Sequence, residues 1–334
     1  MSFWTGKRVL VTGAAGFIGS NLLPRLLERG AKVRAVDNLE RGKLEYIRGV
    51  LRQVEFRKLD LRERQNCLQA CRGMDVVIHL ASKVGGIGYY MGKPSDVLMQ
   101  AVLMDAFMLQ GVLAAGVERY FYASSAHIYP IELQQDIRAV FIKEPQAIPA
   151  HPELSYGWGK LIGEKQIEYA VAQGLPLKAA VFRLIGAYGP NQDLDLATGS
   201  CIPVFCRRAI EYPRGKPFRV LGTGRETRSY CYIDDVLDAL LRSVEKLAAK
   251  RPLVGPLNVG SEDLVSIADL AKMIIEISGK DIPIVFDRSH KTVIWGQALD
   301  CSRAAKELGG WRPKVSLREG LERVYRHVEG RLAK

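Results

Sequence analysis

The sequence predicts an α/β protein, with a Rossmann-like, doubly wound parallel sheet and a smaller, mixed α/β C-terminal lobe. Two observations support this fold class. Apolar runs typical of buried strands alternate with helical patterns between positions 1 and 180 of the chain. A glycine-rich turn joins the first strand to the first helix. In such a fold the carboxyl ends of the parallel strands form the ligand crevice.

The expected elements follow one another in regular order. Strands are expected at residues 8–12, 32–37, 54–58, 75–81, 118–124 and 178–184. Helices are expected near residues 17–29, 62–71, 95–115 and 154–173. After residue 185 the elements shorten and Gly and Pro become frequent, which indicates a second lobe. Further on we expect a helix at 232–247, a strand at 257–261 and a helix at 264–278.

The glycine-rich turn has the chemistry of an anion site. After an apolar strand, the spacing G-x-x-G-x-x-G occurs at Gly13, Gly16 and Gly19. Glycines at these positions let the backbone bend tightly and approach a ligand. The free N–H groups at the start of the next helix, where Phe17 and Ile18 lie, then face an anion such as a pyrophosphate.

Asp37 favours NAD over NADP. It ends the second strand, downstream of Gly19, at a position where a carboxylate accepts hydrogen bonds from the adenosine ribose. The nearby Arg34 and Arg41 keep NADP open as an alternative. Two further strand ends, at Asp60 and at HLAS (79–82), are expected to meet the cofactor. The expected NAD site comprises Gly13, Gly16, Phe17, Ile18, Gly19, Asp37, Asn38, Asp60, Leu61, Leu80, Ala81, Ser82, Tyr156 and Lys160.

Composition excludes several other classes of protein. The net charge is +12, but the basic residues are spread along the chain without a nucleic-acid motif, so we expect no nucleic-acid partner. The six cysteines show no zinc-like spacing, and we expect reduced thiols, no metal and a cytoplasmic location. Because a core strand begins near residue 8 and Asp105 and Gln110 interrupt the apolar stretch 97–116, we expect neither a signal peptide nor a membrane span.

Tyr156 and Lys160 form the candidate catalytic pair. At i and i+4 near the start of a helix, both side chains lie on one helix face. An ammonium group beside a phenol stabilises the phenolate, so we expect a lowered tyrosine pKa and a base that acts on a sugar hydroxyl. The preceding strand ends in Ser124 and Ser125, and a hydroxyl there can hydrogen-bond the same substrate oxygen. His79, inside a strand, is expected to be a core or cofactor-side residue.

Taken together, these motifs resemble the extended short-chain dehydrogenase/reductase family over almost the whole chain. The similar segments are GAAGFIG, Asp37, SSAHIYP, Tyr156-x-x-x-Lys160, YGP at 188–190 and RSYCYIDD at 228–235. The resemblance implies that Ser125, Tyr156 and Lys160 are the catalytic triad and that Arg228 binds the nucleotide diphosphate or ribose.

The resemblance also implies that one lobe binds NAD and the other binds the nucleotide sugar. We assign residues 1–184, plus roughly 232–262, to an NAD-binding domain. Residues from roughly 185 to 231 and from 263 to 334 are assigned to a nucleotide-sugar-binding lobe. Dimerisation through two helices per subunit is usual in this family, so the helices at 95–115 and 154–173 are the candidates for a homodimer interface.

Within the family, the chain is most similar to enzymes that act on GDP-sugars. KVGGI (83–87) is similar to GDP-fucose synthases, whereas IPVFCRRA (202–209) and GRETRSY (224–230) are similar to GDP-mannose 3,5-epimerases. Those enzymes carry a cysteine two residues after the catalytic serine, and this chain has His127 there. Their second acid falls on Ser200 or Cys201, and the Asn of their R-x-x-N-x-Y-G-P motif is Gly186 here.

His127 is then a candidate proton shuttle at the sugar ring. An ordinary imidazole titrates near neutrality and is able to move a proton at C3 or C5, although a purely hydrogen-bonding role is equally open. Cys201 is a further candidate, as the acid on the opposite face. The expected substrate-binding residues are Lys83, Gly85, Gly86, Ser125, His127, Ser200, Cys201 and Arg228.

We therefore predict an NAD-dependent nucleotide-sugar epimerase that acts through a transient 4-keto sugar on a GDP-hexose, inverting C3, C5 or both. Three alternatives stay open: a 4-epimerase of a UDP- or GDP-sugar, a 4-keto-sugar reductase or 4,6-dehydratase, and a non-catalytic NAD-binding scaffold. Ala126-His127, where a dehydratase normally has an Asp-Glu pair, argues against dehydration.

Overall fold

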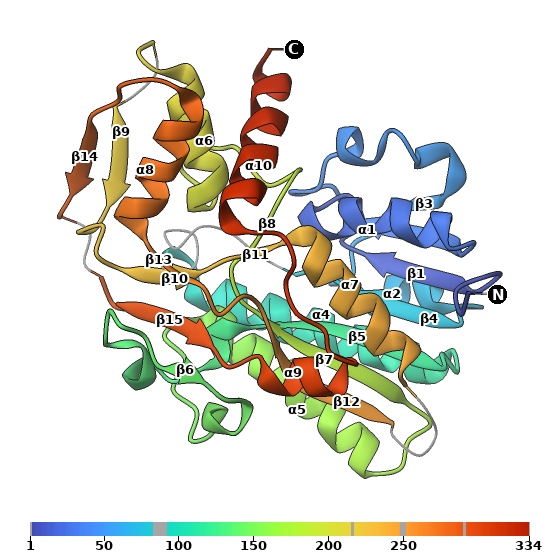
Figure 1. Cartoon of the computed structure of the whole chain (residues 1–334). Coiled ribbons are helices and arrows are strands. Elements are labelled where there is room, and N and C mark those ends of the chain that lie inside the picture. The colour runs from blue at the N-terminus through green and yellow to red at the C-terminus, as the bar shows by residue number, and fades with distance from the viewer. Residues whose placement is uncertain (1, 83–91, 215–216, 248–251, 290–291, 334) are drawn as a thin grey trace.

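The computed structural model describes residues 2–82, 92–214, 217–247, 252–289 and 292–333 (Figure 1). Its centre is a seven-stranded sheet with the order β12-β7-β5-β4-β1-β2-β3, in which all neighbours run parallel. This order confirms the doubly wound fold. The strands are β1 (Arg8–Thr12), β2 (Lys32–Asp37), β3 (Glu55–Lys58), β4 (Val76–His79), β5 (Arg119–Ser125), β7 (Lys178–Leu184) and β12 (Leu253–Val259).

Helices cover both faces of the sheet (Figure 1). Val9 and Val11 of β1 join one buried cluster and Leu10 joins a second on the opposite face, because successive strand residues alternate in direction. The first cluster includes residues of α1 (Phe17–Glu28) and α7 (Ile233–Glu245). The second includes residues of α2 (Arg64–Cys71), α4 (Pro94–Ala114) and α5 (Ser155–Ala172). Burial on both faces explains why β1 is a continuous apolar run.

Helix α4 is the one described helix that is long and apolar enough to cross a membrane by length and composition. It packs instead against α2 and α5, and Val97, Met104, Met108 and Val112 are buried there. It also carries Asp105, which is buried and ion-paired with Lys160 of α5. A charged pair inside the protein is the pattern of a helix that packs in a core.

Outside the central sheet and the helices that cover it, the described residues form short strands and four further α-helices. One sheet has the order β13-β10-β15-β6, and two further sheets pair β11 with β8 and β14 with β9. The strands are β6 (Phe141–Ile142), β8 (Ala187–Tyr188), β9 (Phe218–Leu221), β10 (Thr227–Ser229), β11 (Cys231–Tyr232), β13 (Leu264–Ser266), β14 (Ile284–Asp287) and β15 (Gly296–Leu299). The helices are α6 (Cys201–Glu211), α8 (Ile267–Ser278), α9 (Ser302–Glu307) and α10 (Leu317–Leu332).

Two expected elements have other bounds than the sequence suggests. The strand expected at 257–261 is β12, which begins at Leu253 and ends at Val259. The helix expected at 264–278 starts at Ile267, and residues 264–266 form strand β13 instead. The Ser266 side chain accepts a hydrogen bond from the Asp269 N–H at 3.0 Å and so caps α8. The apolar residues ahead of this cap pair with β10. The expectation of a helix at 264–278 is therefore wrong in its first three residues.

A buried ion pair joins β7 to α5 beneath the crevice. The Arg183 guanidinium donates to both carboxylate oxygens of Glu164, with the shortest distance 2.7 Å, and both side chains are 5% exposed. Arg183 also donates to the Tyr129 hydroxyl at 3.0 Å and to the Glu144 carbonyl at 2.7 Å. Ser124 of β5 donates to Glu164 at 2.5 Å. The pair thus connects the end of the sheet to the helix that carries Tyr156 and Lys160.

We expect Glu164→Gln to lower the free energy of unfolding by about 3–5 kcal/mol, because it leaves the Arg183 charge buried without its counter-ion. Glu168→Gln on the same helix is the matched control, since its partner Lys165 and Glu168 itself are 39% and 48% exposed. That variant should change stability by less than about 0.5 kcal/mol. Chemical denaturation measures both, and equal effects of the two substitutions would contradict the assignment.

Candidate active site

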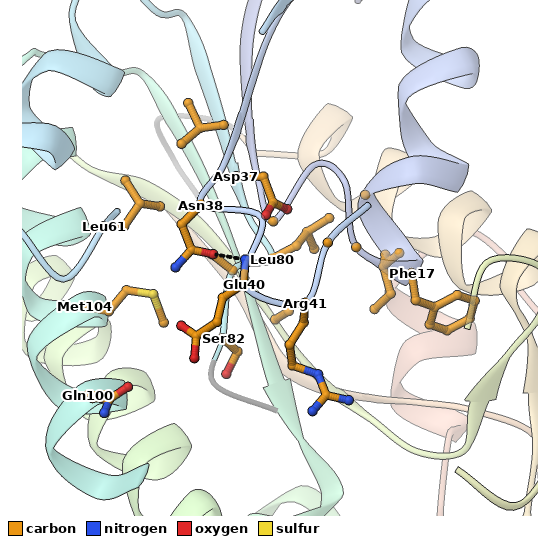
Figure 2. Close-up of a pocket in the computed structure, with 18 of the residues that line it drawn as sticks. Phe17, Asp37, Asn38, Glu40, Arg41, Leu61, Leu80, Ser82, Gln100 and Met104 are labelled. Carbon is orange, nitrogen blue, oxygen red and sulfur yellow. Dashed lines mark hydrogen bonds between the residues drawn. The ribbon is translucent and has the colours of Figure 1, made fainter. Parts of the chain in front are cut away.

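A cavity of about 370 Å³ opens at the carboxyl ends of the central strands. Every residue of the expected NAD site lines it, and Ser125 joins them there. Figure 2 shows Asp37, Asn38 and Glu40, from the end of β2 and the loop after it, across the cavity from Gln100 and Met104 of α4. Leu80 and Ser82 come from the segment after β4.

The turn between β1 and α1 leaves room only for backbone. Gly13 has φ +64°, and a Cβ atom there would lie 2.9 Å from the Ala81 nitrogen. A Cβ atom on Gly19 would lie 2.3 Å from the Gly13 carbonyl oxygen. Helix α1 begins at this turn without a side-chain cap and with no acidic residue in its first turn. Its N-terminal N–H groups therefore suit the diphosphate of a dinucleotide.

Asp37 is held in place at the end of β2. Its two carboxylate oxygens accept hydrogen bonds from the Leu39 N–H at 2.8 Å and the Ala15 N–H at 3.0 Å. Burial raises its pKa, although these two hydrogen bonds oppose the shift. A carboxylate fixed here fits ribose hydroxyls and repels the extra phosphate of NADP. The alternative cations are engaged elsewhere, Arg34 with Glu55 at 2.9 Å and Arg41 with Asp193 at 2.7 Å.

Several residues of the cavity were not predicted. The Arg62 guanidinium pairs with Asp60 and Glu40 and donates to Gln100 at 3.1 Å, which ties β3, the loop after β2 and α4 together. Arg41 joins the first lobe to Asp193 of the second. The unpredicted lining residues are Val36, Glu40, Gly42, Leu59, Arg62, Gln100, Met104, Ala123, Leu184 and Ala187. Arg62 could have been found from its place two residues after the strand-end Asp60, whereas Gln100 and Met104 carry no signal in the sequence.

Ser125, Tyr156 and Lys160 all line the cavity. Burial raises the pKa of Tyr156 to about 12, against the lowering effect of hydrogen bonds with Ser125 and Ser82. The expectation of a lowered tyrosine pKa is therefore wrong for this structure, because desolvation of the phenolate is the largest effect. Burial also lowers the pKa of Lys160, while the carboxylates of Asp105 and Glu164 oppose that shift.

His127, an expected substrate-binding residue, lies beside Tyr156. The His127 ring lies edge-on to the Tyr156 ring, with 5.9 Å between centroids. Its Nδ1 atom is buried and has no hydrogen-bond partner among the described residues. Burial, and then the charge of Arg228, lower the pKa of His127 to about 4. The expectation that this imidazole titrates near neutrality is therefore wrong, since it is uncharged at neutral pH.

Arg228 carries a positive charge that acts on several residues of the site, among them His127. Its guanidinium donates to the Thr227 carbonyl at 2.8 Å and to the Ile294 carbonyl at 2.9 Å. Its charge acts on His127, on Cys201 and on Glu153, a half-buried carboxyl three residues before Tyr156 whose pKa is raised by burial. Glu153 was not predicted, because nothing in its sequence context distinguishes it from a surface acid.

Cys201 and Ser200 differ in their surroundings. The Cys201 thiol lies 3.0 Å from the Tyr230 hydroxyl, and burial raises its pKa. Ser200 is exposed, and its hydroxyl accepts a hydrogen bond from the Gln192 amide at 3.2 Å. Of these two candidates for a second acid, the charge of Arg228 acts on Cys201. Lys83, Gly85 and Gly86 lie outside the described residues.

The fold and this cavity define the class of dinucleotide-binding proteins with a doubly wound sheet, and Ser125, Tyr156 and Lys160 line the same cavity. Residues 9–260 match the model of the NAD dependent epimerase/dehydratase family, and the chain belongs to that family. It is an NAD-dependent enzyme, and its relatives act as nucleotide-sugar epimerases and dehydratases.

Individual relatives agree with this assignment. The chain is 31% identical to GDP-mannose 3,5-epimerase 1 of Oryza sativa subsp. japonica, over 99% of this chain and 85% of the relative. It is 30% identical to GDP-L-fucose synthase of Sinorhizobium fredii, over 96% and 95% of the two chains. Among solved structures, UDP-glucose 4-epimerase of Thermotoga maritima is similar, with a TM-score of 0.86, 29% identity and coverage of 97% and 99%.

We expect Gly19→Ala to weaken NAD⁺ binding at least about tenfold, or about 1.4 kcal/mol. The added methyl group collides with the Gly13 carbonyl and displaces the turn that faces the diphosphate. Gly49→Ala is the control, because a Cβ atom there meets nothing within 4 Å. Calorimetric titration with NAD⁺ measures both variants, and thermal unfolding without NAD⁺ checks that they fold. Unchanged affinity in folded Gly19→Ala would refute this placement of the diphosphate.

Proposed function

We propose that this enzyme epimerises a nucleotide-hexose, with a GDP-hexose favoured, at C3, C5 or both through a transient 4-keto sugar. The observation that carries the proposal is the uncharged His127 imidazole beside Tyr156. A neutral imidazole with a free ring nitrogen is a base that can remove a proton from carbon. The similarity to GDP-mannose 3,5-epimerase and GDP-L-fucose synthase supports the GDP-sugar preference.

The residues divide the first half of the reaction among them. When bound, NAD⁺ supplies the acceptor, and later the donor, of the C4 hydride. Tyr156 takes the proton of the C4 hydroxyl, and Ser125 hydrogen-bonds the same oxygen. Lys160 stabilises the phenolate with its positive charge. The pKa of about 12 that burial gives Tyr156 makes this nearby charge essential.

His127 and Cys201 then form an acid–base pair for the carbon chemistry. The 4-ketone acidifies the hydrogens on C3 and C5. Because its pKa is about 4, His127 is unprotonated at neutral pH, as a base must be, although the low pKa also makes it a weak base. Because burial raises its pKa, the Cys201 thiol keeps its proton and can deliver it to the opposite face. The pair would replace the cysteine and the second acid of the similar epimerases.

A 4-epimerase is the second candidate function. The similarity to UDP-glucose 4-epimerase of Thermotoga maritima favours it. In that reaction the keto sugar turns over in the site and no carbon-bound proton is lost, so His127 would serve only as a hydrogen-bonding group. Tyr156, Lys160 and Ser125 would keep the same roles.

We also propose a homodimer and a cytoplasmic location. Helices α4 and α5 contact each other and expose large apolar side chains, with Met99 56%, Leu103 47% and Tyr169 68% exposed. A second copy of the chain packed on these helices would cover that surface. The six cysteines are free thiols, which supports a reducing compartment.

NMR in D₂O with GDP-mannose and UDP-glucose should show deuterium entering C3 or C5 of the GDP-sugar. Tyr156→Phe should reduce this incorporation at least about 100-fold, because the 4-ketone is not formed without the base. Its unfolding midpoint should match that of the unmodified protein. Inversion at C4 without deuterium would establish the 4-epimerase instead, and normal turnover by Tyr156→Phe would exclude both mechanisms.

The pH dependence of this exchange distinguishes a depressed histidine from an ordinary one. A base acts when unprotonated, so a pKa of about 4 keeps His127 active on lowering the pH from 7.5 to 5.5. Relative to the rate of hydride transfer to NAD⁺, which depends on Tyr156, the exchange rate should therefore change less than about twofold, whereas an ordinary histidine with a pKa near 6.5 would lose about tenfold. His127→Asn, which keeps a hydrogen-bonding group, should remove the exchange. Retained exchange in that variant would remove His127 from the mechanism.

A further inference from the structure

A buried array of polar side chains lies behind the catalytic lysine. It links Thr12, His79, Asp105, Tyr122 and Lys160, which come from β1, β4, α4, β5 and α5. All five residues are at most 3% exposed. Polar side chains buried this deeply are stable only when they form hydrogen bonds or ion pairs with one another, because each unpaired polar group would lower stability.

The protonation of His79 follows from its neighbour. The Thr12 hydroxyl oxygen accepts hydrogen bonds from the N–H groups of Leu80 and Ala81, both at 3.1 Å. Its own hydrogen is therefore free to go to His79 Nδ1, 2.7 Å away. The other ring nitrogen, Nε2, then carries the hydrogen and donates to Asp105 Oδ1 at 3.1 Å. Burial lowers the pKa of His79, in agreement with this neutral form.

Asp105 directs its second oxygen to the lysine. Oδ2 accepts a hydrogen bond from the Tyr122 hydroxyl at 2.5 Å and lies 3.9 Å from Lys160 Nζ. The ammonium also lies over the Tyr122 ring, 4.6 Å from its centroid. Helix α5 makes room for this arrangement at Gly163, where a Cβ atom would lie 2.3 Å from the Tyr122 hydroxyl.

Glu164 is the other carboxylate that acts on Lys160, and its charge is committed elsewhere. Both of its oxygens bind Arg183. The remaining titratable groups around the lysine are the neutral His79 of β4 and the phenols of Tyr122 and Tyr156. Asp105 is therefore the one negative charge among the described neighbours that is left to balance the ammonium.

We propose that Asp105 is a positioning residue, whose carboxylate keeps Lys160 protonated and fixed beside Tyr156. The proposal rests on the proposed function, in which the Lys160 charge stabilises the Tyr156 phenolate. His79, Tyr122 and Thr12 in turn hold the carboxylate ionised and correctly turned. Burial alone would raise the pKa of Asp105, but the Lys160 charge and the hydrogen bonds from His79 and Tyr122 make the net shift downward.

The test is the titration of Lys160 itself, in full-length protein carrying ¹³C-labelled lysine. The Lys160 signal is assigned by its loss in Lys160→Arg. Asp105→Asn should lower the midpoint of this titration by about one to three pH units, because the isosteric amide removes the charge. Tyr122→Phe is the matched control. It removes a hydrogen bond to the same carboxylate but keeps the charge, and should change the midpoint by less than about half a unit. An unchanged midpoint in Asp105→Asn would overturn the proposal.

Two further readouts separate positioning from a merely structural role. In unmodified protein at pH 7, the Asp105 carboxyl carbon should have the chemical shift of an ionised acid, and a protonated acid there would overturn the proposal even if Asp105→Asn does not fold. In folded Asp105→Asn, the alkaline limb of kcat should move to lower pH while KM stays within about twofold. Since the titrations need no sugar, a failure of the proposed reaction would leave their outcome intact and distinguishable.

Discussion

The close approach of backbones at the β1–α1 turn is the constraint on which the rest of the site depends. Gly13 lies against Ala81 of the segment after β4, and Gly19 lies against the Gly13 carbonyl. This contact brings the N–H groups of Leu80 and Ala81 onto Thr12. The Thr12 hydroxyl then fixes the tautomer of His79, and His79 orients Asp105 towards Lys160. The glycine-rich turn is thus connected through a chain of contacts to the helix that carries Tyr156 and Lys160.

The same dry interior explains why sequence reasoning succeeded with the fold. The strands and helices expected between β1 and β7 end within two residues of their predicted positions. Strands that are buried on both faces of the sheet need long apolar runs, and these runs can be recognised in the sequence. A clear miss, at residues 264–266, follows from a capping serine ahead of α8. The residues expected to bind the cofactor all line one cavity, because strand ends and the glycine spacing bring them to the same edge of the sheet.

The pKa values of the site residues were less predictable, because they depend on how deeply each side chain is buried, and the adjacent residues in the sequence do not determine that. The i, i+4 spacing of Tyr156 and Lys160 suggested a lowered phenol pKa, yet desolvation raises it. The identity of His127 suggested a group that titrates near neutrality, yet burial and Arg228 depress its pKa. In the sequence, Asp105 is recognisable only as a charged residue that interrupts an apolar helix. Its pairing with Lys160 depends on a contact between α4 and α5 that no local pattern encodes.

The architecture separates the redox chemistry from the choice of sugar. The cavity at the strand ends is built almost wholly from the chain up to Leu184, and Ser125, Tyr156 and Lys160 line it. The fold as a whole does not discriminate among the candidate reactions, since a UDP-glucose 4-epimerase superposes with a TM-score of 0.86 at 29% identity. Selection among these reactions must then depend on other groups, such as the residues on which the charge of Arg228 acts, His127, Glu153 and Cys201. Arg228 lowers the pKa of His127 and opposes the rise that burial causes in the pKa of Cys201, so one fixed cation acts on both residues of the proposed acid–base pair.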